Sequence, residues 1–544
     1  MNQENAKEIR LKYFLLFLGL FIIYFYKMRF SAHQDAMFCA NHARLWLPDQ
    51  AGSVAGMYNI FSLDGLFFMP LTFLYKTIVG SFTGIFLYYR MLYIFVQALV
   101  AVCTYLEFRH HVDKKIAAVL SVMVFVFYYC YYMFGYKAQL FWFGIAGLLC
   151  ILHYRRDPKA IYAILSACFI SYTVLSYCTA VLLAIPLMIY VFRKGSGKHV
   201  LLFILTGVLC ALLTVIILLR YDSFQNILAV SFQKFSVTVR GRGLLNAVKN
   251  WVLIIALALG AFVPAFLFER KFKGKNRYLF LFAFAVLILA ALIGAKPQSV
   301  SIYRFTYIFI CIATWGLGAS LSAQKRAEGG NPVEMDIIWL LNAYSLIMML
   351  SISLATNQGV SVVAFGVLFA LMAFVIILMS ESGEDKWAGR MASLIVCLMI
   401  FIFVFFVSEN NYYADGRGNI FTPRIKVTSE EPLKGMYLKE QQLNENRMLY
   451  EVLEKHTSKD DMLLLFDNPT YGYFTTEAAM AYDNNYRNDI DLMKKHFEMF
   501  PKCSPTVVII KADSPFWEKV GYSEWLRSQF QVVDEMNGFC VLKP

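Results

Sequence analysis

The sequence is poor in charge and lacks the short motifs that mark several common soluble enzyme classes. Charged residues make up 16% of its 544 positions, whereas a soluble domain typically holds about a quarter. It contains no P-loop, no G-x-S-x-G turn, no H-E-x-x-H helix and no cysteine pairs with zinc spacing. These absences argue against a P-loop NTPase, a hydrolase with a nucleophile elbow and a zinc protease.

Cysteines that could form disulfides are also scarce. Eight of the eleven cysteines lie inside apolar runs, where cysteine behaves as a small core hydrophobe. Only Cys39, Cys503 and Cys540 lie outside such runs. Cys503 and Cys540 could pair if the C-terminal part of the chain faces an oxidising compartment.

Long apolar runs are what the sequence has instead, because 59% of its residues are hydrophobic. A membrane-spanning helix needs about 20 mostly apolar residues, and we predict thirteen such spans. The run at 60–80 is apolar enough to cross as well, but it carries Asp64, Pro70 and Lys76. The predicted spans are 12–29, 85–106, 116–134, 138–153, 160–175, 176–192, 200–219, 249–268, 278–294, 303–322, 336–356, 360–380 and 391–408.

The distribution of charge predicts which way the spans run. The net charge of +13 falls in short basic clusters between apolar runs, which is typical of membrane topology and not of nucleic-acid binding. If 60–80 lies in the membrane interface, these clusters fall on the side of the N-terminus, as the positive-inside rule requires. We therefore expect a multi-pass plasma-membrane protein with a cytoplasmic N-terminus, an outer first loop at 30–82, and an extracytoplasmic chain after about Ser408.

The composition changes sharply after the last predicted span. We expect a small α/β domain at 409–544, separate from a transmembrane domain at 1–408. Its expected strands are 461–466, 506–511 and 538–542, and its amphipathic helices are 443–455 and 488–499.

Basic residues on the expected outer side are the first candidates for a binding site. Lys296 and Arg304 flank a turn between two spans with Tyr303 beside them, and a phosphate partner suits such a pair. Arg90 and Lys137 lie near the outer ends of their spans and could join the same site. The alternative for each is snorkelling, in which the aliphatic stem stays in the interface while the charge reaches water.

The first outer segment, SAHQDAMFCANHARLWL (31–47), has an ionisable helical face. Its members Asp35, Phe38, Cys39, His42 and Trp46 recur at helical spacing. One reading is an interfacial amphipathic helix whose aromatic rings anchor among the headgroups and whose start is capped by Asp35. The other is a carboxylate held at the membrane surface as a general base. Spacing alone favours the first reading.

The order of these features resembles the GT-C class of membrane glycosyltransferases, which includes bacterial aminoarabinose transferase and the protein O-mannosyltransferases. The resemblance implies an all-α polytopic membrane domain of about thirteen helices, GT-C-like, with a C-terminal extracytoplasmic α/β domain. It rests on the segment around Asp35, the Arg-led span GIFLYYRMLYIF with Arg90, the turn FGYKAQLF with Lys137 and Gln139, and the turn GAKPQSVSIYRF with Lys296.

The resemblance also implies a reaction. A hexosyl- or pentosyltransferase of this class would move a sugar from a polyprenyl-phosphate donor to a lipid, cell-wall polymer or protein acceptor at the outer face of the bilayer. Asp35 would be the general base. Because cationic side chains can stabilise the leaving phosphate, we expect no metal and no cofactor. The donor-phosphate candidates are Lys296, Arg304 and Arg90, and the substrate-binding candidates are Lys137, Gln139, His42 and Tyr303.

Two other functions fit the same sequence. A flippase or transporter of a lipid-linked glycan would also have many spans and outer basic residues. Transporters place ionisable residues at mid-membrane depth and often have repeated halves, whereas this sequence has few such residues and no internal repeat. The third possibility is a binding or scaffold protein whose working part is the C-terminal domain.

Overall fold

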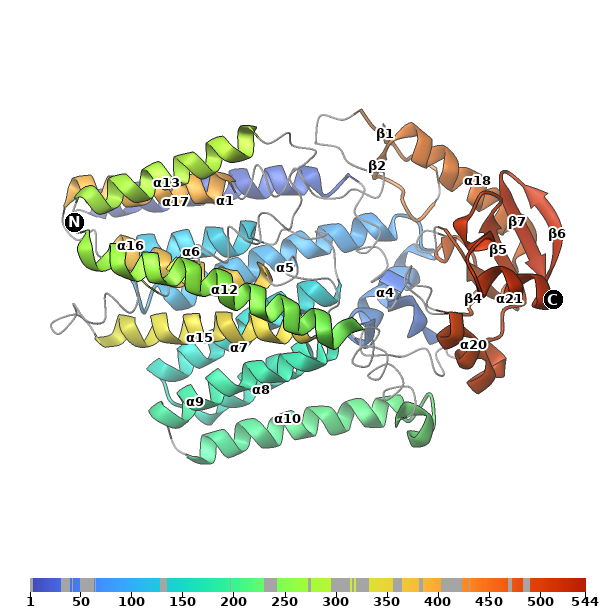
Figure 1. Cartoon of the computed structure of the whole chain (residues 1–544), viewed down its shortest axis with the longest axis horizontal. Helices are drawn as coiled ribbons and strands as arrows, with labels where there is room; N and C mark the ends of the chain where they lie inside the picture. Colours follow the sequence, from blue (N-terminus) through green and yellow to red (C-terminus); the bar gives the residue numbers. More distant parts are fainter. Residues whose placement is uncertain are drawn as a thin grey trace.

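The structure, a computed structural model, is a bundle of apolar helices with a mixed α/β region at one end (Figure 1). The residues that it describes are 3–30, 40–41, 43–48, 63, 65–127, 135–195, 197–228, 242–272, 275–294, 314–315, 318, 332–355, 364–380, 385–402, 423–429, 431–467, 472–482 and 490–544.

The helices of the bundle coincide with twelve of the thirteen predicted spans, and the span at 303–322 lies largely outside the described residues. A short 3₁₀ helix, Cys178–Leu183, follows α8, so the turn expected near Ser176 is confirmed. The helices are α1 (Gln3–Lys27), α5 (Ile85–Phe108), α6 (Lys114–Val126), α7 (Tyr136–Arg156), α8 (Ala160–Ser176), α9 (Ala184–Lys194), α10 (Gly197–Leu218), α12 (Arg242–Lys271), α13 (Lys275–Gly294), α15 (Pro332–Ala355), α16 (Ala364–Ser380) and α17 (Lys386–Ile402).

Length and hydropathy identify a membrane protein. Among the described residues, four helices are long and apolar enough to cross a bilayer by themselves: α5, α7, α10 and the Met335–Leu354 part of α15. Further apolar helices of 10–17 residues include Ala160–Ser176 and Gly366–Ser380. In α10 only 6% of the apolar window is buried inside the protein, so this helix presents nearly all of its surface to the surroundings.

The two ends of the bundle differ, and we name them by what lies on them. The covered end carries the α/β region, which we call the C-terminal region (423–544): the amide of Gly84, before α5, donates to the carbonyl of Glu431 at 3.0 Å. The chain's N-terminus lies at the opposite end (Figure 1). The chain therefore begins on the side away from the C-terminal region.

Charged side chains at the opposite end confirm how the predicted helix ends are grouped. Lys194 at the end of α9 and Arg155 near the end of α7 lie 2.8 Å and 3.8 Å from Asp336 at the start of α15. Arg277 at the start of α13 lies 2.7 Å from Glu269 near the end of α12. The helix ends that were expected on the N-terminal side therefore meet at one end of the bundle.

The helix α4 (Gly65–Val79) lies at the covered end, between the bundle and the C-terminal region (Figure 1). Its residues Phe68 and Thr72 are buried, whereas Phe73, Leu74 and Ile78 are exposed. One buried face and one exposed apolar face are typical of a helix that lies along a membrane interface. This agrees with the expectation that the 60–80 run does not cross.

The C-terminal region contains a five-stranded mixed sheet of order β4-β3-β5-β7-β6. Strand β3 is parallel to β4 and β5, and β7 is antiparallel to β5 and β6. The expected strands and helices are confirmed, while β4, β6 and α21 were not expected. The bounds are β3 (Met462–Leu465), β4 (Ala479–Met480), β5 (Val507–Lys511), β6 (Gln531–Met536), β7 (Phe539–Lys543), α18 (Glu440–His456), α20 (Ile490–Met499) and α21 (Tyr522–Gln529), with a β1–β2 ribbon of Ile425–Lys426 and Tyr437–Leu438.

Alternation along the strands divides the core of the C-terminal region into two layers. On one face Leu463 and Leu465 belong to a cluster with Leu453 of α18. On the other face Leu464 packs in a cluster with Met493 of α20. The boundary predicted at 408/409 lies outside the described residues.

The cysteines Cys503 and Cys540 are both buried in the second layer, and no disulfide joins them. Burial raises the pKa of Cys503 to about 11. The possible disulfide between them is therefore not present, because each thiol is packed as a small apolar side chain.

Candidate functional site at the covered end

Three of the eight predicted site residues are in the described part of the chain, and all three lie near the covered end. They are Arg90, Lys137 and Gln139. The other five, Asp35, His42, Lys296, Tyr303 and Arg304, lie outside the described residues.

Arg90 is on the second turn of α5, and only 1% of its surface is exposed. Its Nη1 donates a hydrogen bond to the carbonyl of Phe30. Phe30 follows α1 and is the last described residue before the segment that contains Asp35. Arg90 is therefore held against the beginning of the predicted acid segment.

Lys137 and Gln139 are on the first turn of α7, with exposed fractions of 3% and 0%. The hydroxyl of Ser176, at the end of α8, donates to Oε1 of Gln139 at 2.9 Å. The Nζ of Lys137 lies 5.5 Å from the ring centroid of Tyr136. The first contact holds Gln139 between α7 and α8, and both side chains lie away from solvent.

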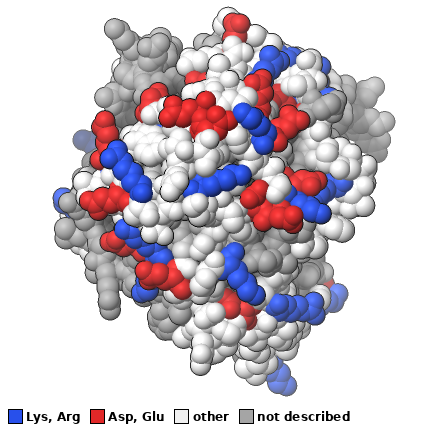
Figure 2. Space-filling view, turned by 90° about the vertical axis from the view of Figure 1, so that its right-hand side faces the viewer, with Lys and Arg blue, Asp and Glu red and all other residues white. Residues whose placement is uncertain are grey.

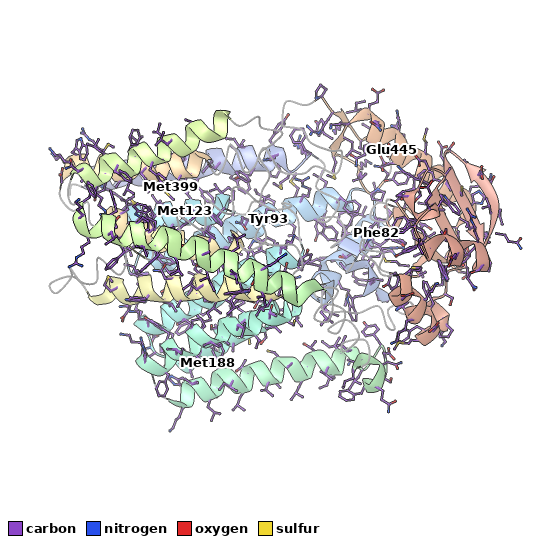
Figure 3. All side chains as sticks on the ribbon, viewed as in Figure 1. Phe82, Tyr93, Met123, Met188, Met399 and Glu445 are labelled. Carbon is purple, nitrogen blue, oxygen red and sulfur yellow. The ribbon has the colours of Figure 1, made fainter. Side chains whose placement is uncertain are left out.

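The packing of α5 against α7 places Arg90 and Gln139 at the same depth. The rings of Tyr93 and Trp142 lie 5.3 Å apart, and Nε1 of Trp142 donates to Oε1 of Gln97 at 2.5 Å. Arg90 precedes Tyr93 by three residues on α5, and Gln139 precedes Trp142 by three residues on α7. Three residues of helix correspond to about 4.5 Å along the helix axis. Both helices start at the covered end, so Arg90 and Gln139 lie in one layer, between the Tyr93–Trp142 ring pair and that end. Figure 3 shows Tyr93 within the bundle.

Burial decides against snorkelling for Arg90 and Lys137. A snorkelling side chain keeps its charge in water, yet these residues are 1% and 3% exposed. Removing a cation from water costs several kcal/mol unless hydrogen bonds or an opposite charge compensate. The covered end therefore keeps two cations inside the protein, and snorkelling does not account for either of them.

Three polar residues near this site were not singled out in the sequence: Lys27, Asn41 and Arg44. Their exposed fractions are 4%, 0% and 1%. Among the residues that the structure describes, neither amide atom of Asn41 has a hydrogen-bond partner. The sequence does contain a signal, because Asn41 and Arg44 are three residues apart in a helical stretch, on a face other than that of Asp35.

Arg44 connects this helical turn to the C-terminal region. Its Nη2 donates to the carbonyls of Thr476 at 2.9 Å and Ala478 at 3.1 Å. Its guanidinium carbon lies 5.8 Å from the ring centroids of both Phe82 and Phe474. Phe82, labelled in Figure 3, lies where the turn before α5 meets the C-terminal region.

A second connection runs from the end of α1 to the β1–β2 ribbon. The amide of Tyr437 donates to the carbonyl of Arg29 at 2.7 Å. The rings of Tyr437 and Phe30 lie 5.7 Å apart, and the guanidinium of Arg424 lies 5.2 Å from the ring of Phe30. Phe30 is thus enclosed by the C-terminal region on one side and by Arg90 on the other.

The start of α5 is joined to the C-terminal region by close packing. Gly84 has a φ of +75°, and a Cβ at this position would lie 3.2 Å from the Tyr75 hydroxyl. Beside it, the rings of Phe86 and Phe474 lie 5.1 Å apart. Burial raises the pKa of Glu431, whose carboxylate accepts a hydrogen bond from Ser429 at 2.7 Å.

The face of the C-terminal region that points away from the bundle is mixed in charge. Figure 2 shows acidic and basic side chains interspersed across it. On the described part of this face, no extended patch of one sign is visible. The described part of this outer face therefore offers no single-sign surface for a charged partner.

Comparisons with known proteins give structural likenesses only. No protein-family model matches the sequence, and no curated protein matches it. ArnT from Cupriavidus metallidurans, crystallised bound to undecaprenyl phosphate, is similar at a TM-score of 0.42 and 11% identity over 98% of both chains. Its apo crystal structure is similar at a TM-score of 0.41 and 10% identity over the same shares.

A further likeness is to the archaeal oligosaccharyltransferase AglB from Archaeoglobus fulgidus, in complex with an inhibitory peptide and a dolichol-phosphate. The TM-score is 0.44 and the identity 11%, over 93% of this chain and 70% of that one. At these values the likeness carries no argument, so the function below is argued from the residues of the site.

Proposed function

We propose that the chain is a membrane glycosyltransferase of the GT-C type. It would transfer a hexosyl or pentosyl group from a polyprenyl-phosphate donor to a lipid, cell-wall polymer or protein acceptor at the outer face of the plasma membrane. The C-terminal region then lies outside the cell, and the covered end is the catalytic end.

The observation that carries this proposal is the burial of Arg90 beside the segment of Asp35. The guanidinium of Arg90 is 1% exposed and bonds to the carbonyl of Phe30, which precedes the predicted base closely in the sequence, and this supports a cation near that base. Lys137, 3% exposed on the neighbouring α7, adds a second cation. Transfer from a lipid phosphate uses a base and cations together. The base takes the proton that the acceptor loses, and the cations stabilise the negative charge that the leaving phosphate gains.

Each predicted residue has one task in this proposal. Asp35 takes the proton from the acceptor hydroxyl as it attacks the anomeric carbon. Cations at fixed positions stabilise the leaving phosphate, which is worth several kcal/mol in a site that excludes water. The phosphate-binding residues are Lys296, Arg304 and Arg90, and the residues that bind the rest of the substrates are Lys137, Gln139, His42 and Tyr303.

The test is transfer from a labelled polyprenyl-phosphate sugar by the full chain in membranes. We expect Asp35→Asn to lower the rate by about 10²–10⁴, and Lys296→Ala to lower it as well. Asp113→Asn is the matched control, because Asp113 caps α6 at the opposite end and accepts from the Lys115 amide at 2.8 Å. Asn caps a helix about as well as Asp. Unchanged transfer in both Asp35→Asn and Lys296→Ala would end the assignment.

The same assay separates the enzyme from the transporter. A transferase releases free polyprenyl phosphate in proportion to the sugar that it transfers. A flippase moves the intact lipid-linked sugar across the membrane and releases none. Movement without release would favour the transporter.

A further inference from the structure

The hairpin of α12 and α13 carries exposed positive charge at the opposite end of the bundle. Arg270 and Lys271 lie in the last turn of α12 and Lys275 begins α13, and all three are exposed. Glu269 is the only acid in the sequence of these two helices and their turn. Its carboxylate lies 2.7 Å from Nε of Arg277, and both residues are buried. The one acid of the hairpin is therefore neutralised inside the protein, and the exposed charge has one sign.

Other basic side chains at this end lie close to acids. Lys194 lies 2.8 Å from Asp336, and Lys159 lies 2.7 Å from Asp157. The positive-inside rule accounts for basic residues at this end in general. The hairpin differs from these pairs because its exposed cations have no exposed acid on the same two helices.

Aromatic rings are exposed directly beside these cations. The ring of Phe268 lies 4.6 Å from that of Phe272 and 4.4 Å from that of Phe280. The rings of Phe284 and Trp315 lie 6.1 Å apart. The exposed fractions of Phe272, Phe280 and Phe284 are 38%, 45% and 39%. Rings at the ends of membrane helices lie at the level of the lipid headgroups.

The apolar surface continues along both helices, away from the cations. On α13, Phe280, Phe284 and Leu287 follow one another at helical spacing, and each is exposed. Val263 and Leu267 are exposed on α12 in the same way. The seven residues from the first to the last of the α13 set correspond to about 10 Å along the axis. The cations therefore stand at the head of an apolar surface long enough for part of an acyl chain.

We propose that this hairpin binds an anionic phospholipid of the leaflet on the N-terminal side of the bundle. Arg270, Lys271 and Lys275 donate hydrogen bonds to the phosphate, and an acyl chain packs against Phe280 and Phe284. Basic clusters beside membrane helices are typical binding sites for anionic headgroups. A zwitterionic lipid has the chains without the net charge, and a soluble phosphate has the charge without the chains, so neither matches both parts of the surface.

The test measures lipid binding to the purified full chain by native mass spectrometry, with phosphatidylglycerol and phosphatidylcholine that carry the same acyl chains. The wild type should prefer phosphatidylglycerol. Each basic side chain at an anionic headgroup contributes a factor of about five in affinity, so Lys271→Gln/Lys275→Gln should bind phosphatidylglycerol roughly 25-fold more weakly. Its affinity for phosphatidylcholine should not change. A double variant that keeps the wild-type preference would overturn the proposal.

The matched control is Lys114→Gln/Lys115→Gln. These two lysines are exposed at the start of α6, at the same end of the bundle. An exposed acid, Asp113, precedes them, and the apolar residue that follows, Ile116, is buried. The control should bind phosphatidylglycerol as the wild type does. Equal losses in the two double variants would mean that only the total charge of this end matters, which would overturn the site.

Two further measurements distinguish a bound lipid from a soluble anion. Phe284→Ala should weaken the binding of both lipids several-fold and by the same factor, because it removes contacts with the acyl chain and leaves the cations in place. Unchanged binding would overturn the apolar part of the site. Glycerol 3-phosphate at millimolar concentration should not displace phosphatidylglycerol. Displacement would show that the cations bind soluble phosphates, and the lipid would no longer be the ligand.

Discussion

The two ends of the bundle use charged side chains to join different partners. At the opposite end, acids and bases join one bundle helix to another, as Asp336 does with Lys194 of α9. At the covered end, arginines hold backbone carbonyls of segments that lie outside the bundle, as Arg90 does with Phe30. The first arrangement assembles the bundle, and the second arranges what lies on top of it.

The cluster around Glu107 is an example of an acid at the opposite end that several basic side chains surround. Its two carboxylate oxygens lie 2.9 Å from ring nitrogens of His111 and His153. Arg156 approaches the same carboxylate at 3.9 Å. Three side chains, His111 from the turn after α5 and His153 and Arg156 from α7, thus surround one acid, which is the geometry of a structural junction. We therefore expect changes at this end to affect stability, and changes at the covered end to affect transfer.

The largest effect should come from Arg277→Met at the opposite end. Glu269 and Arg277 are 0% and 2% exposed, and removing one partner of a buried pair leaves an uncompensated charge that costs about 3–5 kcal/mol. We expect a lower unfolding temperature in detergent, with normal transfer per folded molecule. The double variant Glu269→Met/Arg277→Met should recover most of the stability, because no charge remains buried. Lost transfer in a stable single variant would remove the distinction between the ends.

The next effect should come from Arg90→Met at the covered end. Loss of one charge that stabilises a transition state typically costs about 10²–10³ in kcat, so transfer should fall by that order. Arg220→Met, an exposed arginine after α10, is the control for charge on the same side. Equal losses in both variants would mean that general surface charge, and not the buried cation, matters.

Asn41→Leu should affect the unfolding temperature and the rate of transfer differently. Burying an amide without partners is unfavourable by about 1–3 kcal/mol, so an apolar side chain of similar size should maintain or raise the unfolding temperature. If Asn41 binds a hydroxyl group of a substrate, transfer should fall by about tenfold, because that is the effect of losing the free energy of one hydrogen bond. Full activity with higher stability would show that Asn41 has no part in the site.

The smallest effect should be the pH dependence contributed by Glu431. Burial raises its pKa in the folded protein, so the folded state binds this proton more tightly than the unfolded state does. Stability from this group is then highest below the ordinary glutamate pKa, about 4.3, and falls as the pH rises through the raised value. Glu431→Gln should flatten that slope when unfolding temperatures are measured from pH 4 to 8. An unchanged slope would exclude Glu431 as its source.

Most of the bundle could be predicted because hydrophobic length alone specifies a span. Strands β3, β5 and β7 were likewise visible as short apolar runs. Strand β4 has only two residues, and β6, with the sequence QVVDEM, is polar and mostly exposed, so neither has the pattern of a buried strand. Edge strands of this kind are specified by their neighbours.

The site could be predicted only where the type and position of a side chain in the sequence mark it as functional. Arg90 and Lys137 could be singled out because we expected them on the outer side, and basic residues are rare on that side of a membrane protein. The contact of Arg44 was not, since its acceptors are main-chain carbonyls more than 400 residues away. Every residue has such a carbonyl, so no residue type marks the partner.

That choice of acceptor has a consequence for how the protein can vary. A contact with the carbonyls of Thr476 and Ala478 depends on the path of the backbone and hardly on which side chains that path carries. Replacing the side chain of Glu477 should therefore go unnoticed by Arg44, whereas inserting one residue between 476 and 478 should shift the turn and break the contact. The junction restricts the length of the chain and leaves its composition free.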